Sequence, residues 1–244
     1  MDSVDLHGKV ALITGARRGI GAAAADALES LGARVARHQR QGGDFAADLS
    51  QVDAAGDLLQ RVLDRYGRLD YLVNNAALTP LGASEGATAR FSTGAPAAPW
   101  DAALFDQTLA VNLRAPLQLA LLAAERAPML SAIVNIGSGS AARGDGSSSY
   151  YVLSKGTVPV LTEYLARRLA PRVRVNALLA GLIDTEEIAA RGPAFAPRRD
   201  EIMRRTPMGR MGRPEEMAEV IAFLLAGAGF ITGSTVTLDG GWHL

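Results

Sequence analysis

The residues best suited to chemistry in this sequence are a tyrosine and a lysine four positions apart, Tyr151 and Lys155. In a helical stretch this spacing places both side chains on one face, so a phenol and an ammonium group would lie together. Lysine is rare here, because only Lys9 and Lys155 of the 25 basic residues are lysines. A compact ammonium and the rigid fork of arginine are not interchangeable in proton transfer. The lysine at 155 therefore indicates a chemical role.

A serine, Ser138, follows the apolar run at residues 133–136, which is expected to be a strand. The end of that strand would bring its hydroxyl into the same cleft. When a hydride moves to a carbonyl carbon, a proton must reach the oxygen. The ordinary pKa of a phenol is about 10, and lowering it to about 7 takes roughly 4 kcal/mol, which a nearby ammonium could supply. We expect Tyr151 to move the proton, Lys155 to lower its pKa, and Ser138 to orient the carbonyl oxygen.

A glycine-rich turn forms the second candidate site. Gly15, Gly19 and Gly21 directly follow the apolar run at residues 10–14 and open an alanine-rich helical stretch. Glycines at such a junction allow a tight turn, and the amino end of the helix offers unpaired N–H groups and a positive dipole end to a pyrophosphate. The pattern predicts a dinucleotide site and hence a nicotinamide cofactor.

The residues after the second expected strand indicate which dinucleotide binds. A site that selects NAD(H) usually carries an acidic residue about 20 positions after the turn. This chain has His38 and Arg40 there, and Arg18 lies in the turn. Two arginines could surround a 2′-phosphate, so we predict NADP(H) over NAD(H). If the second strand ends later than expected, Asp44 or Asp48 would instead bind the ribose.

The elements that must position these residues alternate along the chain. The apolar runs lie at residues 10–14, 33–37, 71–74, 132–136, 173–177 and 236–238, and the first amphipathic stretches lie at 21–31 and 51–66. Such alternation is typical of repeated βαβ units. The sequence predicts an α/β fold, a single-domain Rossmann-type doubly wound parallel sheet over residues 1–244 with about seven strands and helices on both faces.

Two segments interrupt this alternation, at residues 78–100 and 180–207. The first is rich in Gly, Ala, Ser and Pro, and the second combines Gly, Pro and Arg around short helical pieces. Ligands of such sheets bind at the carboxyl ends of the strands, which both segments follow. We expect both segments to wall a substrate cleft and the second to close over it as a lid. Their composition would suit an anionic or extended substrate and does not identify it.

Composition excludes several other classes of protein. The 244-residue chain balances 25 acidic against 25 basic residues, so it has no charge excess for nucleic acid or an anionic membrane surface. It has no cysteine and three scattered histidines, so thiolate catalysis and a metal site are not expected. No stretch has the pattern of a membrane span or a secretory signal. We expect a cytoplasmic protein with a small-molecule partner.

Together these motifs resemble those of the classical short-chain dehydrogenases/reductases, in particular the 3-oxoacyl-carrier-protein reductases, over nearly the whole chain. The resemblance rests on the glycine turn, residues 74–77, Ser138, the Tyr151 and Lys155 pair, and residues 231–233 and 239–241. It implies Tyr151 as general acid/base and Lys155 as its pKa modulator and a ligand of the nicotinamide ribose. It also implies that Asn112 supports a water that links Lys155 to solvent.

The resemblance further implies the residues that would contact the cofactor. Asp48 would bind the adenine, and Asn75 and Ala76 would lie beneath the adenine ribose. Ile183 and Thr185 would contact the nicotinamide carboxamide. The remaining candidates for the cofactor site are Arg17, Ile20, His38, Leu49, Ala77 and Gly181.

The chain departs from the family pattern in a few places. Ala77 and Ala180 replace a usual glycine and a usual proline, and the segment 78–100 is longer than usual. Ser140 is the less favoured hydroxyl, and Tyr150 is expected to pack or to wall the cleft. The basic cluster after the second strand and residues 169–176 resemble the pteridine reductases, which generally carry an aspartate at the position of Ser138.

The leading hypothesis is an NADPH-dependent reductase of a ketone in a small or medium-sized molecule. An NAD(P)-dependent alcohol dehydrogenase, with the same groups working in reverse, and a pteridine-type reductase are alternatives. A nucleotide sensor without catalysis is disfavoured, because it would have no chemical need for Ser138, Tyr151 and Lys155 together. The resemblance also implies a homo-oligomer, a tetramer or a dimer, and the apolar residues 230–244 would suit either an interface or the core.

Overall fold

The computed structural model describes residues 5–79, 100–139, 141–144, 146 and 148–244. Most of the predicted substrate-side segment 78–100 and the alternative hydroxyl of Ser140 lie outside the described residues. Within the described ranges, no helix is long and apolar enough to cross a membrane.

A seven-stranded parallel sheet forms the centre of the molecule, with the strand order β3-β2-β1-β4-β5-β6-β7. Its strands are β1 (Val10–Ile13), β2 (Arg34–Gln39), β3 (Phe45–Ala46), β4 (Tyr71–Asn74), β5 (Ala132–Ser138), β6 (Arg174–Ala180) and β7 (Thr235–Leu238). Strands β1, β4 and β5 are buried along their whole length, as expected for strands covered on both faces. The order changes direction between β1 and β4, and ligands of such sheets bind beyond the strand ends at this point.

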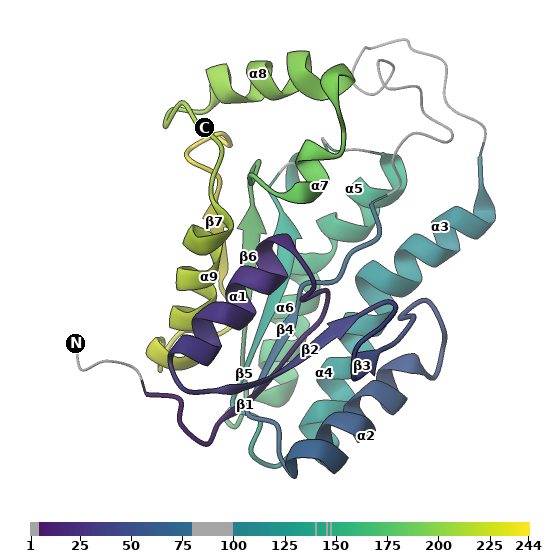
Figure 1. Cartoon of the computed structure of the whole chain (residues 1–244), viewed down its shortest axis with the longest axis vertical. Helices are drawn as coiled ribbons and strands as arrows, with labels where there is room; N and C mark the ends of the chain where they lie inside the picture. Colours follow the sequence, from purple (N-terminus) through teal and green to yellow (C-terminus); the bar gives the residue numbers. More distant parts are fainter. Residues whose placement is uncertain (1–4, 80–99, 140, 145, 147) are drawn as a thin grey trace.

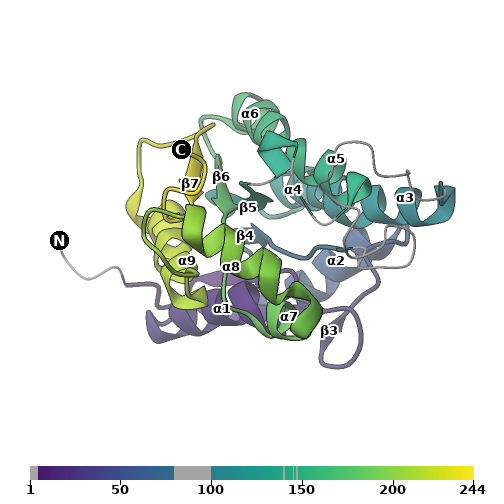
Figure 2. The ribbon, with the colours of Figure 1, turned by 90° about the horizontal axis from the view of Figure 1, so that it is seen from above.

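Helices cover both faces of the sheet, which confirms the predicted fold class (Figure 2). Helices α2 (Ala54–Tyr66), α4 (Ala115–Arg126) and α6 (Val158–Leu169) pack on one face, and α1 (Gly19–Ser30) and α9 (Pro214–Ala222) pack on the other. Leu12 and Ile13, adjacent in β1, belong to the apolar clusters of opposite faces. Because successive side chains of a strand point to opposite faces of the sheet, β1 contributes to the apolar clusters on both faces.

The remaining helices lie around the carboxyl ends of the strands. Helix α3 (Ala102–Leu109) continues through the π-helical turn η1 (Ala110–Arg114) into α4, and α5 (Ser149–Gly156) follows the short 3-10 turn η2 (Ala141–Arg143). Figure 1 shows α7 (Glu186–Ala189) and α8 (Ala196–Arg205) beyond the end of β6. The 3-10 turn η3 (Pro193–Phe195) joins these two helices, and the π-helical turn η4 (Phe223–Gly227) ends α9. The segment 180–207 therefore faces the switch point of the sheet.

Candidate active site

The glycine turn between β1 and α1 has the backbone that its sequence requires. Gly15 and Gly19 have φ angles of 69° and 54°, in the left-handed region that favours glycine. Gly21 packs so closely that an added Cβ would overlap the Gly15 carbonyl oxygen. The side chain of Asn75, just after β4, donates to the carbonyl oxygens of Thr14 and Gly15 at 2.9 and 3.1 Å. The turn is thus held against the neighbouring strand.

His38 supports the same turn from β2. Its Nδ1 accepts a hydrogen bond from the Gly15 N–H at 3.2 Å, and its Nε2 lies 3.0 Å from the Ala47 carbonyl oxygen. An imidazole that accepts at Nδ1 must be neutral and must carry its proton on Nε2. Burial lowers the pKa of His38, which favours this neutral form. The sequence pattern included His38 in the cofactor site but gave no sign of this positioning role.

Arg40 and Asp48 form an ion pair at the far end of the site. Strand β2 runs to Gln39, beyond the predicted end at residue 37, and the Gln39 amide donates to the Gly42 carbonyl oxygen. Arg40 donates through Nε and Nη2 to Asp48 Oδ2 at 3.2 and 3.0 Å. Burial raises the pKa of Asp48, but hydrogen bonds from Ser50 and Arg40 outweigh it and hold the pKa below its usual range. The residue at the strand end is therefore neutral, and Asp48, which lines the cavity, is already paired with an arginine.

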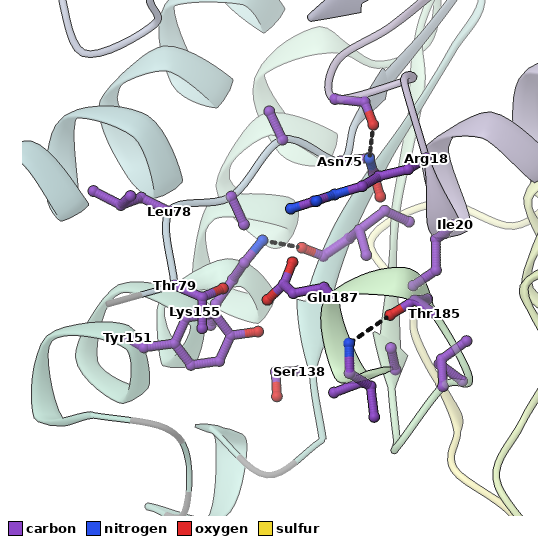
Figure 3. A pocket seen from close by; sticks show the side chains of 18 of the residues that line it. Arg18, Ile20, Asn75, Leu78, Thr79, Ser138, Tyr151, Lys155, Thr185 and Glu187 are labelled. Atoms are coloured by element: carbon purple, nitrogen blue, oxygen red, sulfur yellow. Dashed lines mark hydrogen bonds between the residues drawn. The ribbon is translucent and has the colours of Figure 1, made fainter. Parts of the chain in front are cut away.

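The predicted proton-transfer groups converge at the other end. Strand β5 ends at Ser138, and α5 begins at Ser149 with the Ser148 hydroxyl accepting from the Tyr151 N–H at 3.2 Å. The Ser138 side chain lies close enough to the Tyr151 phenol to act on its pKa. Lys155 is only 4% exposed, and its ammonium donates to the Ile136 carbonyl oxygen at 2.7 Å. The strand end and the helix therefore deliver a hydroxyl, a phenol and an ammonium to one place (Figure 3).

The pKa of Tyr151 is raised, which differs from the expectation that Lys155 lowers it. Burial is the main cause and the Glu187 carboxylate adds to it, whereas the hydrogen bond from Ser138 and the charge of Arg191 oppose it. Burial also lowers the pKa of Lys155 to about 8, and Glu187 opposes that shift. Because desolvation disfavours charge, each group is shifted towards its neutral form. Tyr151 is thus a protonated phenol at neutral pH.

Asn112 lies behind this group in the π-helical turn η1. Its Nδ2 donates to Ser154 Oγ at 2.9 Å and to the Leu78 carbonyl oxygen at 3.0 Å, and its Oδ1 accepts from the Leu78 N–H at 2.7 Å. A π-turn inside a helix is common at functional sites because it changes the register of the backbone carbonyls. Here it fixes the chain after β4 against α5.

One cavity of about 1220 Å³ joins the glycine turn to the proton-transfer groups. All the predicted site residues line it except Gly21 and Asn112, which pack behind it. An added Cβ at Gly15 would come within 2.9 Å of Ala76 Cα, so a glycine is needed for the turn to pack this closely on the chain after β4. The residues of this cavity fit a nicotinamide dinucleotide, because the glycine turn could hold its pyrophosphate and the cavity extends from there to Tyr151. Among the described residues, no group of His, Asp and Glu side chains could hold a metal ion.

Helix α7 contributes two carboxylates that the sequence patterns did not single out, one at the glycine turn and one in the cavity. Glu186 Oε2 accepts a hydrogen bond from the Gly19 N–H at 3.1 Å. Glu187 lines the cavity itself, near Tyr151 and Lys155. One sequence feature could have pointed to these glutamates, since both directly follow Thr185. Thr185 caps α7 by accepting a hydrogen bond from the Ile188 N–H.

Known proteins are similar to this chain over nearly its whole length. The family model described as enoyl-(acyl carrier protein) reductase matches residues 15–243. Granaticin polyketide synthase putative ketoacyl reductase 2 from Streptomyces violaceoruber is 34% identical, over 96% of this chain and 96% of that protein. The 3-oxoacyl-(acyl-carrier-protein) reductase FabG of Pseudomonas aeruginosa is 30% identical, over 99% of this chain and all of the relative (100%).

A solved structure is similar over the same extent. The crystal structure of a short chain dehydrogenase from Burkholderia cenocepacia J2315 in complex with NADP superposes with a TM-score of 0.83 and 30% sequence identity. The match covers 98% of this chain and 99% of that one. The likeness thus spans the sheet, the turn and the helices around the cavity.

Proposed function

The chain belongs to the short-chain dehydrogenase/reductase family of oxidoreductases, and from this premise we propose that it reduces the ketone of a small or medium-sized molecule with NADPH. The observation that carries the proposal is that Ser138, Tyr151 and Lys155 line the same cavity as the glycine turn. A dihydronicotinamide bound there would supply a hydride to the carbonyl carbon.

The side chains of this cavity orient the carbonyl group and supply the proton. Ser138 donates a hydrogen bond that orients the carbonyl oxygen and stabilises its developing charge. Tyr151 gives its phenolic proton to that oxygen, which completes the alcohol. The raised pKa keeps the phenol protonated, which is the form that can give a proton to the carbonyl oxygen. Lys155, whose pKa is about 8, is an ammonium at neutral pH and stabilises the phenolate that is left.

The proposed preference for NADPH rests on the charges at the end of β2. Arg18 and Arg40 both line the cavity there, and the strand ends in the neutral Gln39. Replacing Arg40 by Ala should raise the KM for NADPH and leave that for NADH unchanged. The matched control is Arg37→Ala, because Arg37 pairs with Asp26 and Glu29 instead. A wild-type preference for NADH would contradict this part of the proposal.

We propose that helices α7 and α8 close over the substrate. Residues 187–188, 190–191, 194–195 and 197–198 of this segment line the cavity opposite Tyr151. Pro193 and Pro197 lie at the starts of η3 and α8, so the segment consists of short pieces that can move separately.

A homodimer or homotetramer is part of the proposal. Leu153, Val160 and Tyr164 on α5 and α6 are 59%, 70% and 50% exposed, an apolar set that a second copy of the chain would cover. Sedimentation of the wild type and of Val160→Asp would test it, with a smaller species expected for the variant and one unchanged mass contradicting this interface.

The proposed reaction is tested by following NADPH consumption with a panel of ketones, quinones and pteridines. Reduction of ketones supports the proposal. Turnover of pteridines alone would establish the pteridine-type alternative, and NADPH binding without turnover of any compound would favour a sensor.

A further inference from the structure

Helix α7 places a carboxylate in the cleft that the proposed reaction does not use. Glu187 is half-buried and lines the same cavity as Tyr151, Lys155 and Ser138. Figure 3 shows its side chain reaching from α7 towards Tyr151. Its charge acts on the pKa of both Tyr151 and Lys155, so the carboxylate lies near both groups.

This carboxylate has no hydrogen bond or ion pair to any residue in the described part of the chain. Three cations of the cavity contact other residues. The Lys155 ammonium donates to the Ile136 carbonyl oxygen at 2.7 Å, and Arg198 pairs with Glu201 at 2.9 Å. The guanidinium of Arg191 lies 4.8 Å from the centre of the Phe195 ring.

A substrate that enters the cleft must displace some of the water there. An ionised carboxylate only accepts hydrogen bonds, so an apolar group placed against it imposes a desolvation cost without compensation. A hydroxyl or an ammonium group restores the lost hydrogen bond, and the ammonium also balances the charge. A site built around a buried polar group rejects ligands that leave it unpaired.

We propose that Glu187 determines substrate specificity by accepting a hydrogen bond from a donor group on the carbon next to the reacting carbonyl. The inference rests on the proposed function, because the carbonyl oxygen is placed at Ser138 and Tyr151. The substrate class is then a ketone that carries an adjacent hydroxyl or ammonium group, rather than one flanked by alkyl groups.

The test compares three ketones of equal size: hydroxyacetone, aminoacetone and butanone. For the wild type, kcat/KM should be at least about tenfold higher for one or both donor ketones than for butanone, as for a hydrogen bond to a charged group. Glu187→Leu should remove this preference, so that kcat/KM becomes nearly equal for the three ketones. Glu187→Gln should keep a preference for hydroxyacetone and lose one for aminoacetone, which tells the two donors apart.

Two further measurements exclude indirect effects. Thermal unfolding and the NADPH dissociation constant, from the fluorescence of the bound cofactor, should be the same in all variants. Glu219→Gln, at an exposed position of α9, is the matched control and should retain the wild-type preference.

The outcomes separate this inference from the proposed function. Equal kcat/KM for all three ketones, or a donor preference that persists in Glu187→Leu, would overturn the role of Glu187 while ketone reduction stands. Failure to reduce any ketone, with NADPH bound, would overturn both.

Discussion

Glu186 Oε2 accepts a hydrogen bond from the Gly19 N–H at 3.1 Å, so a carboxylate of α7 lies on the amino end of α1. That helix end, with its unpaired N–H groups and positive dipole end, is where a pyrophosphate would bind. The contact joins the substrate-side helix to the cofactor turn. We expect this contact to be exchanged for the phosphate when the dinucleotide binds.

Glu186→Gln is therefore expected to tighten NADPH binding by about two- to fivefold, the size of a charge effect at a helix end. The amide can still accept from Gly19 but no longer repels the pyrophosphate. Fluorescence titration with NADPH measures the effect, with Glu219→Gln as the control. Weaker binding by the variant would mean that Glu186 helps to hold the cofactor instead.

His38 should make stability depend on pH. Its pKa is lowered from the ordinary value of 6.5, chiefly by burial and further by Arg61, so the folded state binds a proton less readily than the unfolded chain. The stabilisation is complete above 6.5 and is lost as the pH falls through the lowered value. Urea unfolding across this range should show a steeper loss for the wild type than for His38→Asn, which keeps an acceptor for the Gly15 N–H. Parallel profiles would contradict the role of the imidazole.

Lys155 should set the alkaline limit of reduction. Its pKa is about 8, so the ammonium form dominates below that value and is lost as the pH rises through it. We expect kcat to fall above a pH of about 8 in the wild type. Lys155→Met should lower kcat by roughly 100-fold or more and remove this limb. If kcat of Lys155→Met still falls above a pH of about 8, another group causes that fall.

Gly21 should be intolerant of even a methyl group. An added Cβ would overlap the Gly15 carbonyl oxygen and come within 2.5 Å of Asn75 Nδ2. Gly21→Ala is expected to lower the free energy of unfolding by about 1–3 kcal/mol and to weaken NADPH binding, because the turn must shift. Gly229→Ala, where an added Cβ meets nothing within 4 Å, is the control. Equal urea midpoints for both variants would contradict the packing argument.

Much of the fold could be predicted because parallel strands covered on both faces produce continuous apolar runs. Six of the seven strands followed from such runs. Strand β3, Phe45–Ala46, did not, because two residues paired with His38 and Gln39 are too short to show a period. The end of β2 at Gln39 was placed too early for a related reason, since arginine and histidine interrupt the apolar run.

The candidate site was predictable where a motif fixes the backbone, as at Gly15 and Ser138. Other features depend on how distant segments pack. Nothing in the spacing of residues indicates that His38 accepts from Gly15, or that Glu186 and Glu187 reach the cofactor turn and Tyr151. The direction of the Tyr151 pKa was also missed, because burial outweighs the stabilising charges and is not visible in a sequence pattern.

The role of Tyr151 as proton donor is tested most directly by measuring ketone reduction by Tyr151→Phe under saturating NADPH. NADPH binding is measured for the same variant. Phenylalanine keeps the ring in α5 but has no proton to give to the carbonyl oxygen. We expect kcat to fall by about 100-fold to 10,000-fold while the NADPH dissociation constant changes little. Turnover near the wild-type value, with NADPH bound, would contradict the central role of Tyr151.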